Sequence, residues 1–274
     1  MPSATVTCPG SAGWSRGRRS PARGARAGPI APATVLLLGL LLAACAAPKP
    51  PAATVPVAAP PESTLGRLVA RAGFVSVLAY APGERRAEPR RVVLGGGSGT
   101  LIGTEGLVVT AAHVAVGEGF PVEVTTVDGA RFAGRVLALL PEKDLAFLCV
   151  PGLIGRPGVR LRLSDPLPGA PVLAFGSPRE GRIAAAAGRV RGGRLSGSIH
   201  YGRFVLEAPL ELALTIGPGF SGGPVVDVDG ELVGMLASFA LDTGDDGDPP
   251  GRGLAFAVPG KTLAAELPAA RCAR

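Results

Sequence analysis

Histidine is scarce in this sequence, which contains only His113 and His200. No histidine follows Ser221, the serine of the glycine-rich stretch Gly217–Pro224, and no aspartate precedes His113. The first absence excludes an α/β-hydrolase, although Gly219–Gly223 fits the G-x-S-x-G pattern, because that class needs the chain order serine, acid, histidine. The second absence argues against the subtilisin order, in which an aspartate comes before the histidine. Nothing around His200 resembles such a site.

Net charge is also low outside the first 45 residues. Five of the 28 basic residues lie in residues 1–45, which contain no acid, so the rest of the chain carries 23 bases against 21 acids and a net charge of +2. A body with so little charge gives no reason to expect nucleic acid or an anionic membrane surface as its partner.

The sequence has an apolar run near its start, but a short one. Thr34–Ala44 has eleven residues, whereas a bilayer span needs roughly 20. Behind an arginine-rich stretch, this run has the size of the apolar region of a secretory signal. It ends in Leu42-Ala43-Ala44-Cys45, which resembles a bacterial lipobox. We therefore expect residues 1–44 to be a signal peptide and Cys45 to carry a lipid, with ordinary signal cleavage as the alternative.

The segment after this signal predicts a spacer. Residues 46–61 contain six prolines and a single charge, a composition that cannot bury a core and favours an extended chain. Residues 45–61 are therefore predicted to tether a folded domain, residues 62–270, to a membrane. The expected location is the cell envelope, either periplasm or cell surface.

Glycine and proline are abundant, with 41 and 28 residues, which favours many short strands over long helices. Alternation of apolar and polar residues predicts the strands. In the first half they are 74–80, 100–104, 106–112, 122–127, 131–140 and 144–150. In the second half they are 170–176, 183–193, 202–210, 224–230, 231–238 and 253–259. Residues 261–267 are predicted to form a short closing helix.

Ser221 needs a base and an orienting acid to become a nucleophile. The remaining chain order is histidine, aspartate, serine, which is the trypsin-like order. His113 follows an apolar strand and small residues, and is favoured over His200 as the base. Asp144 stands at the start of an apolar strand and is favoured over Asp128 and Asp165, which lie in turns.

Four cysteines are present, of which Cys8 lies in the signal and Cys45 in the lipobox. Cys149 lies in the apolar run LAFLCV and is favoured as a small buried apolar residue. A disulfide between Cys149 and Cys272 is the alternative in an oxidising compartment.

Together the motifs resemble the Deg/HtrA branch of the trypsin-like serine proteases over roughly residues 64–266. Those motifs are GSGTLIGTEGLVVTAAHV (97–114), VDGARFAGRVLALLPEKDLAFLCV (127–150), VLAFGSP (172–178), GPGFSGGPVVDVDGELVGML (217–236) and GLAFAVP (253–259). The resemblance implies an all-β fold, a trypsin-like double six-stranded antiparallel β-barrel with a short C-terminal helix. Barrel one would span about 72–155 and barrel two about 160–259.

The same resemblance implies the chemistry. His113 would be the general base, Asp144 its orienting acid and Ser221 the nucleophile, while the N–H groups of Gly219 and Ser221 would form the oxyanion hole. The implied function is a serine endopeptidase, without cofactor, that acts on exposed or misfolded envelope proteins. A latent or non-catalytic domain used for binding or chaperoning is the alternative.

Three departures from the family pattern narrow these expectations. Phe220 precedes the serine where Deg-type members have asparagine and digestive trypsins aspartate, so activation through an ion pair with a new amino terminus is not expected. Fifteen residues follow Pro259, too few for a PDZ module. Thr215, six residues before the serine, would form the floor of the specificity pocket and carries no charge, which predicts a small or medium apolar P1 residue.

Two charged loops complete the sequence predictions. Residues 81–93 carry four arginines and are expected to be a solvated loop, with contacts in a homo-oligomer as the alternative. Residues 241–251 carry four aspartates whose spacing does not fit an EF-hand. No metal is expected.

Overall fold

The computed structural model describes residues 64–82, 92–179, 182–194, 197–241, 253–269 and 272. The predicted signal peptide, the tether and Cys45 lie outside these residues, as do 83–91 and 242–252 in the two charged loops. Within the described residues, no helix has the length and hydropathy needed to cross a membrane.

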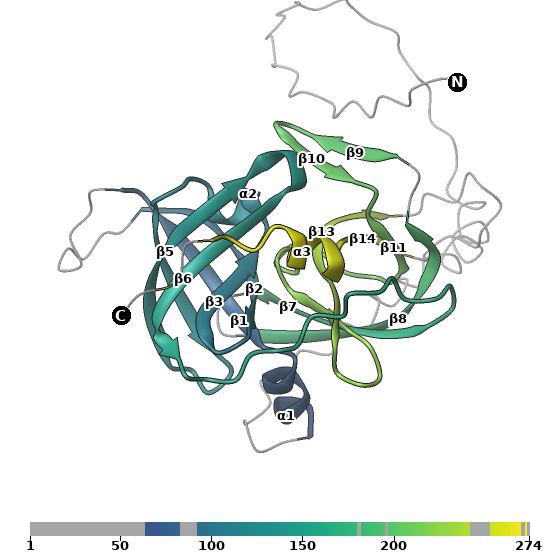
Figure 1. Ribbon diagram of the computed structural model, residues 1–274, viewed down its shortest axis with the longest axis horizontal. Coiled ribbons are helices and arrows are strands. Elements are labelled where there is room, and N and C mark those ends of the chain that lie inside the picture. The colour runs from purple at the N-terminus through teal and green to yellow at the C-terminus, as the bar shows by residue number, and fades with distance from the viewer. Residues whose placement is uncertain are drawn as a thin grey trace, which may run out of the picture. The chain divides into compact units, whose positions relative to one another are not determined.

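The first half of the described chain forms a closed six-stranded barrel (barrel one), drawn in blue to teal in Figure 1. All neighbouring strands are antiparallel, in the order β1-β2-β3-β6-β5-β4. The strands are β1 Phe74–Tyr80, β2 Val93–Ile102, β3 Glu105–Thr110, β4 Pro121–Thr126, β5 Arg131–Leu140 and β6 Leu145–Ile154. In β1, Val75, Val77 and Ala79 are almost fully buried, and Ser76 and Leu78 between them are only partly buried, so the alternation in the sequence places one face in the core.

The second half forms another closed antiparallel barrel (barrel two), in the order β11-β14-β13-β12-β7-β8 (Figure 1). Its strands are β7 Pro171–Arg179, β8 Arg182–Arg194, β11 Leu210–Ala213, β12 Pro224–Val226, β13 Leu232–Leu241 and β14 Gly253–Pro259. The two six-stranded barrels confirm the predicted fold class.

One predicted strand of barrel two was wrong. Residues 202–210 were expected to form a single barrel strand, but β10 Phe204–Glu207 pairs with β9 Ser198–Tyr201 in a separate two-stranded hairpin. The barrel strand is the next one, β11, which pairs with β8 and β14. A left-handed Ala208, with φ of 40°, separates β10 from β11. The sequence did not indicate this left-handed conformation, because alanine disfavours it.

Helices are short in this protein. α1 Thr64–Arg71, which the sequence analysis did not predict, precedes barrel one. α2 Ala112–Ala115 is a single turn after β3, and a 3-10 turn, Pro141–Lys143, precedes β6. α3 Gly260–Ala265 follows β14 and confirms the predicted closing helix to within two residues at its end.

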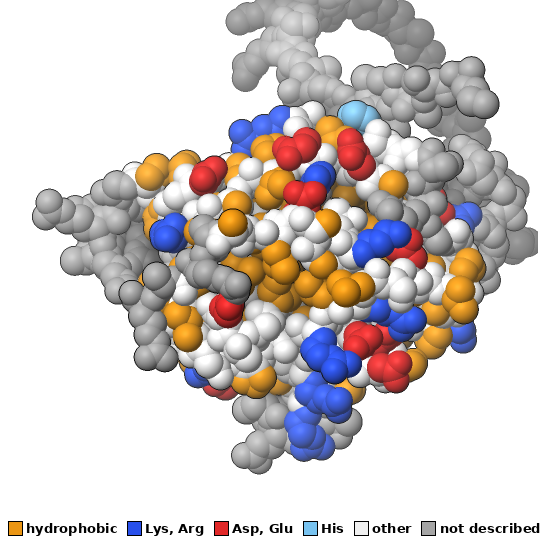
Figure 2. Space-filling model, viewed as in Figure 1, with side chains coloured by type: hydrophobic (Ala, Val, Ile, Leu, Met, Phe, Trp, Pro, Cys, Tyr) orange, Lys and Arg blue, Asp and Glu red, His pale blue; other side chains and the backbone are white. Residues whose placement is uncertain are grey.

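The chain end after α3 returns to barrel one. Cys149 in β6 and Cys272 form a disulfide with a Cα–Cα distance of 5.1 Å. The preferred interpretation of Cys149 as simply a small apolar residue was therefore wrong, and the alternative is confirmed. Lys143 also forms an ion pair with Glu266, directly after α3. Figure 2 shows this face of the molecule, where hydrophobic side chains gather near the middle, around the place of α3 in Figure 1, with charges of both signs around them.

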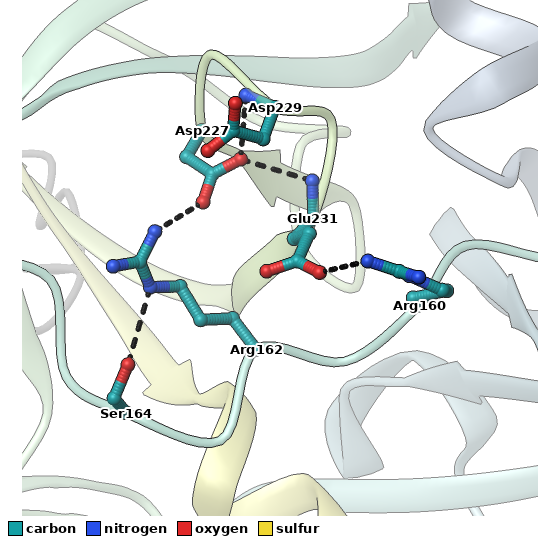
Figure 3. Close-up of polar contacts among 6 residues, drawn as sticks. All are labelled: Arg160, Arg162, Ser164, Asp227, Asp229 and Glu231. Carbon is teal, nitrogen blue, oxygen red and sulfur yellow. Dashed lines mark hydrogen bonds and ion pairs between the residues drawn. The ribbon is translucent and has the colours of Figure 1, made fainter.

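Polar contacts connect the segment between the barrels to the turn between β12 and β13 (Figure 3). Arg162 Nη1 lies 2.6 Å from Asp227 Oδ2, and the backbone N–H of Arg162 donates to Leu232 O at 2.9 Å. The other Asp227 oxygen accepts hydrogen bonds from the N–H groups of Asp229 and Glu231, both at 3.0 Å. The Asp227 side chain thereby stabilises the turn and joins it to the linker.

Candidate active site

His113 lies on the one-turn helix α2, directly after barrel strand β3. Its neighbours Ala112 and Val114 are buried in barrel one, whereas the His113 side chain is 30% exposed. The small residues that precede it allow the chain to turn out of the strand. The imidazole therefore lies at the surface of barrel one and is partly exposed.

Asp144 follows the 3-10 turn and precedes β6, as the sequence analysis expected for a carboxylate at a strand start. Its backbone is left-handed, with φ of 43°, a conformation that aspartate tolerates better than most residues. The residue is fully buried. Burial of a carboxylate is stable only where donors surround it, and His113 supplies two of them, its backbone N–H and Nδ1.

The structure brings His113 and Asp144 together. His113 Nδ1 lies 2.9 Å from Asp144 Oδ2 and 3.1 Å from Oδ1, and the His113 backbone N–H donates to Oδ1 at 3.1 Å. An ionised carboxylate can only accept, so Nδ1 carries the proton and Nε2 is left as the basic nitrogen. This is the tautomer that a general base requires.

The alternatives from the sequence analysis lie elsewhere. His200 is exposed on β9, with Nε2 2.9 Å from Ser198 Oγ. Asp128 is in an exposed turn, where a hydrogen bond from Thr126 lowers the pKa of its carboxyl. Asp165 pairs with Lys261 at 2.5 Å.

Ser221 lies in a tight turn that connects to both barrels. Its carbonyl accepts a hydrogen bond of 2.8 Å from Ser98 N on β2, and Gly222 N donates to Leu236 O on β13 at 2.7 Å. Gly219 and Gly222 have φ of +92° and +84°. A Cβ on Gly222 would lie 2.0 Å from Ser98 O, so only glycine permits both this backbone angle and this close approach.

The turn of Ser221 and the helix of His113 meet at Gly97. A Cβ on Gly97 would lie 2.8 Å from Val114 Cγ2 and 2.9 Å from Ser221 O, so this glycine lets the two segments approach. Among the described residues, no hydrogen bond reaches the Ser221 hydroxyl.

Ser98 is a buried residue that the sequence analysis did not single out. Its hydroxyl donates to Gly219 O at 2.7 Å and accepts from Ser177 N at 3.0 Å. Its own carbonyl accepts from the Thr110 hydroxyl at 2.7 Å. Ser98 therefore fixes the peptide of Gly219 relative to strands of both barrels. Its place in the motif GSGT was visible in the sequence, but its contacts were not.

Phe220 packs into the core of barrel two. Its side chain is 2% exposed, and a Cβ on Gly176 of β7 would lie 2.4 Å from its ring. A buried aromatic ring thus anchors the Ser221 turn. Digestive trypsins have an aspartate at this position, which would need an ion-pair partner.

Thr215 is exposed beside the first residue of β14, where its hydroxyl accepts a hydrogen bond of 3.2 Å from Gly253 N. A groove of about 470 Å³ borders Gly219 between the barrels. Its lining includes Ser177 and Pro178 of barrel two and Leu78, Gly97 and Arg131 of barrel one. Over the residues that the structure describes, no group of three or more metal-ligating side chains occurs.

Tyr201 is a second residue that the sequence analysis missed. It lies on β9, and its hydroxyl donates to Asp144 Oδ2. Its ring meets the His113 ring edge to face, with centroids 6.1 Å apart. Tyr201 lies between the predicted strands 183–193 and 202–210, and no signal in the sequence indicated its contact with Asp144.

Comparison with known proteins agrees with this architecture. A family model described as a trypsin-like peptidase domain matches residues 97–235. The chain is 34% identical to a probable periplasmic serine endoprotease DegP-like of Ectopseudomonas mendocina over 65% of its length and 35% of that protein. It is 32% identical to the serine protease PepD of Mycobacterium tuberculosis over 82% of its length and 50% of that protein. It thus spans about a third to a half of these relatives.

A solved structure is similar as well. The crystal structure of the Rv3671c protease, inactive form, shares 27% identity with a TM-score of 0.56, and the match covers 76% of this chain and 96% of that one. The double barrel, the motif order and the family match over half of the sequence lead to one conclusion: this chain belongs to the trypsin-like peptidase family, with Deg/HtrA serine proteases among its relatives.

Proposed function

We propose that this protein is a serine endopeptidase with the catalytic triad His113, Asp144 and Ser221. The observation that carries the proposal is the pair of His113 and buried Asp144, joined at 2.9 Å. The meeting of the His113 helix and the Ser221 turn at Gly97 and the family of the chain support it further.

The proposed reaction is acyl transfer in two steps. Ser221 Oγ attacks the carbonyl carbon of the scissile peptide while His113 Nε2 takes its proton. The N–H groups of Gly219 and Ser221 stabilise the oxyanion. His113 then protonates the leaving amine, and water hydrolyses the acyl-enzyme by the same route. Asp144 keeps the imidazole in the tautomer with Nδ1 protonated and stabilises the imidazolium.

The proposed substrates are exposed or misfolded proteins of the cell envelope. Residues of both barrels line the groove beside Gly219, and relatives of the chain include proteases described as periplasmic. The exposed, uncharged Thr215 favours a small or medium apolar P1 residue.

The proposed anchor is a lipid on Cys45, which would hold the enzyme at a membrane of the envelope. Replacement Cys45→Ala is expected to move the protein from the membrane to the soluble fraction of cells. Unchanged fractionation of the variant would contradict the anchor and leave the proposed activity untouched.

A fluorophosphonate probe tests the catalytic proposal, because it reacts with an activated serine. We expect labelling of the wild type that is lost in Ser221→Ala. It should persist in the matched control Ser164→Ala, since Ser164 is exposed in the linker between the barrels. Circular dichroism of each variant checks the fold.

The rival function is a non-catalytic trypsin-like domain that binds or chaperones proteins. A folded wild type without Ser221-dependent labelling, even with denatured casein present, would favour the rival and overturn the protease proposal.

A further inference from the structure

The hairpin of β9 and β10 belongs to neither barrel, yet it covers the pair of His113 and Asp144. It enters from β8 and leaves to β11, so it is part of the barrel-two half of the chain. Arg203 and Phe204 of the hairpin contact the barrel-one half of the chain. Arg203 Nη2 donates to Val116 O at 2.9 Å, and the Phe204 ring lies 5.9 Å from the His113 ring, centroid to centroid.

The protonation of the Tyr201 phenol determines which group donates in the hydrogen bond between Tyr201 and Asp144. Desolvation of the half-buried phenol, and the neighbouring Asp144, raise the pKa of Tyr201 well above its ordinary value. The phenol therefore keeps its proton and donates to Oδ2 of the carboxylate. Hydrogen bonds to a charged group are stronger than neutral ones.

Three groups then hold the Asp144 carboxylate. Oδ1 accepts from the His113 backbone N–H, Oδ2 accepts from Tyr201, and the imidazole Nδ1 lies within hydrogen-bond distance of both oxygens. Two of the three donors belong to His113 itself. Tyr201 is the donor that ties the carboxylate to a part of the chain outside barrel one.

We propose that Tyr201 is a positioning residue of the active site, whose hydroxyl fixes the rotation of the Asp144 carboxylate and through it the imidazole of His113. This inference rests on the proposed triad. His113 and Asp144 both belong to the barrel-one half of the chain, whereas the β9–β10 hairpin belongs to the barrel-two half. The orientation of the pair would therefore depend on both halves. Without the hydroxyl, His113 supplies the remaining hydrogen bonds to the carboxylate among the described residues, and the rotation of the carboxylate is less constrained.

The kinetic test replaces the hydroxyl alone. Tyr201→Phe is expected to lower kcat about tenfold on a peptide substrate with KM changed less than about twofold, because the lost interaction acts on the reacting groups rather than on substrate binding. The matched control is Tyr80→Phe, since Tyr80 on β1 is the other of the two tyrosines in the chain. It should retain the wild-type kcat.

A spectroscopic test separates positioning from packing. The Nδ1 proton shared by His113 and Asp144 is expected far downfield in proton NMR, and it should shift or broaden in Tyr201→Phe but not in Tyr80→Phe. Thermal unfolding of both variants checks the fold. An unchanged kcat together with an unchanged proton resonance would overturn the proposal and leave Tyr201 as a packing residue.

Fluorotyrosine labelling gives a measurement that keeps the hydroxyl in place. Two fluorine resonances are expected, and Tyr80→Phe assigns them. The Tyr201 resonance should shift in Asp144→Asn, whereas that of Tyr80 should not. A Tyr201 resonance that does not shift in Asp144→Asn would contradict the proposal. If the wild type shows no Ser221-dependent turnover, the proposed function fails, but these NMR readouts still decide whether Tyr201 positions Asp144.

Discussion

At the scale of single residues, Phe220 and Gly176 form a matched pair in the core of barrel two. The Phe220 ring fills the space that a side chain on Gly176 would need, and a Cβ there would also lie 2.8 Å from Phe220 Cα. The ring therefore fixes the backbone one residue before Ser221.

Gly176→Ala is accordingly expected to lower the free energy of unfolding by about 1–3 kcal/mol, the usual cost of overpacking a core. Urea denaturation measures it. The matched control is Gly197→Ala, because nothing lies within 4 Å of a Cβ at Gly197, and its free energy of unfolding should change by less than about 0.5 kcal/mol. Combining Gly176→Ala with Phe220→Leu should recover part of the loss. Equal stability of the two alanine variants would contradict this packing.

At the scale of elements, Asp227 connects the linker between the barrels (residues 155–170) to the turn from β12 to β13. Its side chain is 6% exposed and accepts from Arg162 and from two backbone N–H groups. The hydrogen bond with Asp227 also raises the pKa of Arg162. Nearby, Arg160 pairs with Glu231 at 2.5 Å, but the Arg160 side chain is 83% exposed.

The two ion pairs should therefore differ in their contribution to stability. Asp227→Ala is expected to cost about 1–3 kcal/mol in the free energy of unfolding, because it leaves donors without a partner. Glu231→Ala should cost less than about 1 kcal/mol, as is typical of exposed pairs. Chemical denaturation of both variants gives the comparison. A larger loss in Glu231→Ala than in Asp227→Ala would refute the role assigned to Asp227.

At the scale of the whole described domain, the disulfide closes the chain end onto barrel one. Cys149 and Cys272 are 123 residues apart in sequence, and all of barrel two lies between them. A crosslink over so long a loop restricts the unfolded chain strongly. Lys143 and Glu266 add a second contact between the same regions.

Cys272→Ser is thus expected to lower the free energy of unfolding by about 2–5 kcal/mol relative to the oxidised wild type. Reduction of the wild type with dithiothreitol should produce a similar loss and serves as the control. If the oxidised wild type and the variant unfold at the same denaturant concentration, the disulfide does not contribute to stability in this way.

Prediction from sequence succeeded where the information is local or lies in chain order. Period-2 alternation identified all six strands of barrel one and five of the six in barrel two. It failed at residues 202–210 because a hairpin and a barrel strand share the same alternation, and only strand pairing distinguishes them. The position of Asp144 at the start of an apolar strand favoured it over Asp128 and Asp165, and its carboxylate lies 2.9 Å from His113 Nδ1.

By itself, the sequence determined the family, the order histidine, aspartate, serine and the glycines that the Ser221 turn requires. The tertiary structure alone decided which distant groups hold that turn and the pair of His113 and Asp144. Tyr201 reaches Asp144 across 57 residues, Ser98 reaches Gly219 across 121, and the disulfide spans 123. Such contacts depend on how the barrels and the hairpin pack in space, and no periodicity along the chain encodes a distance between residues so far apart.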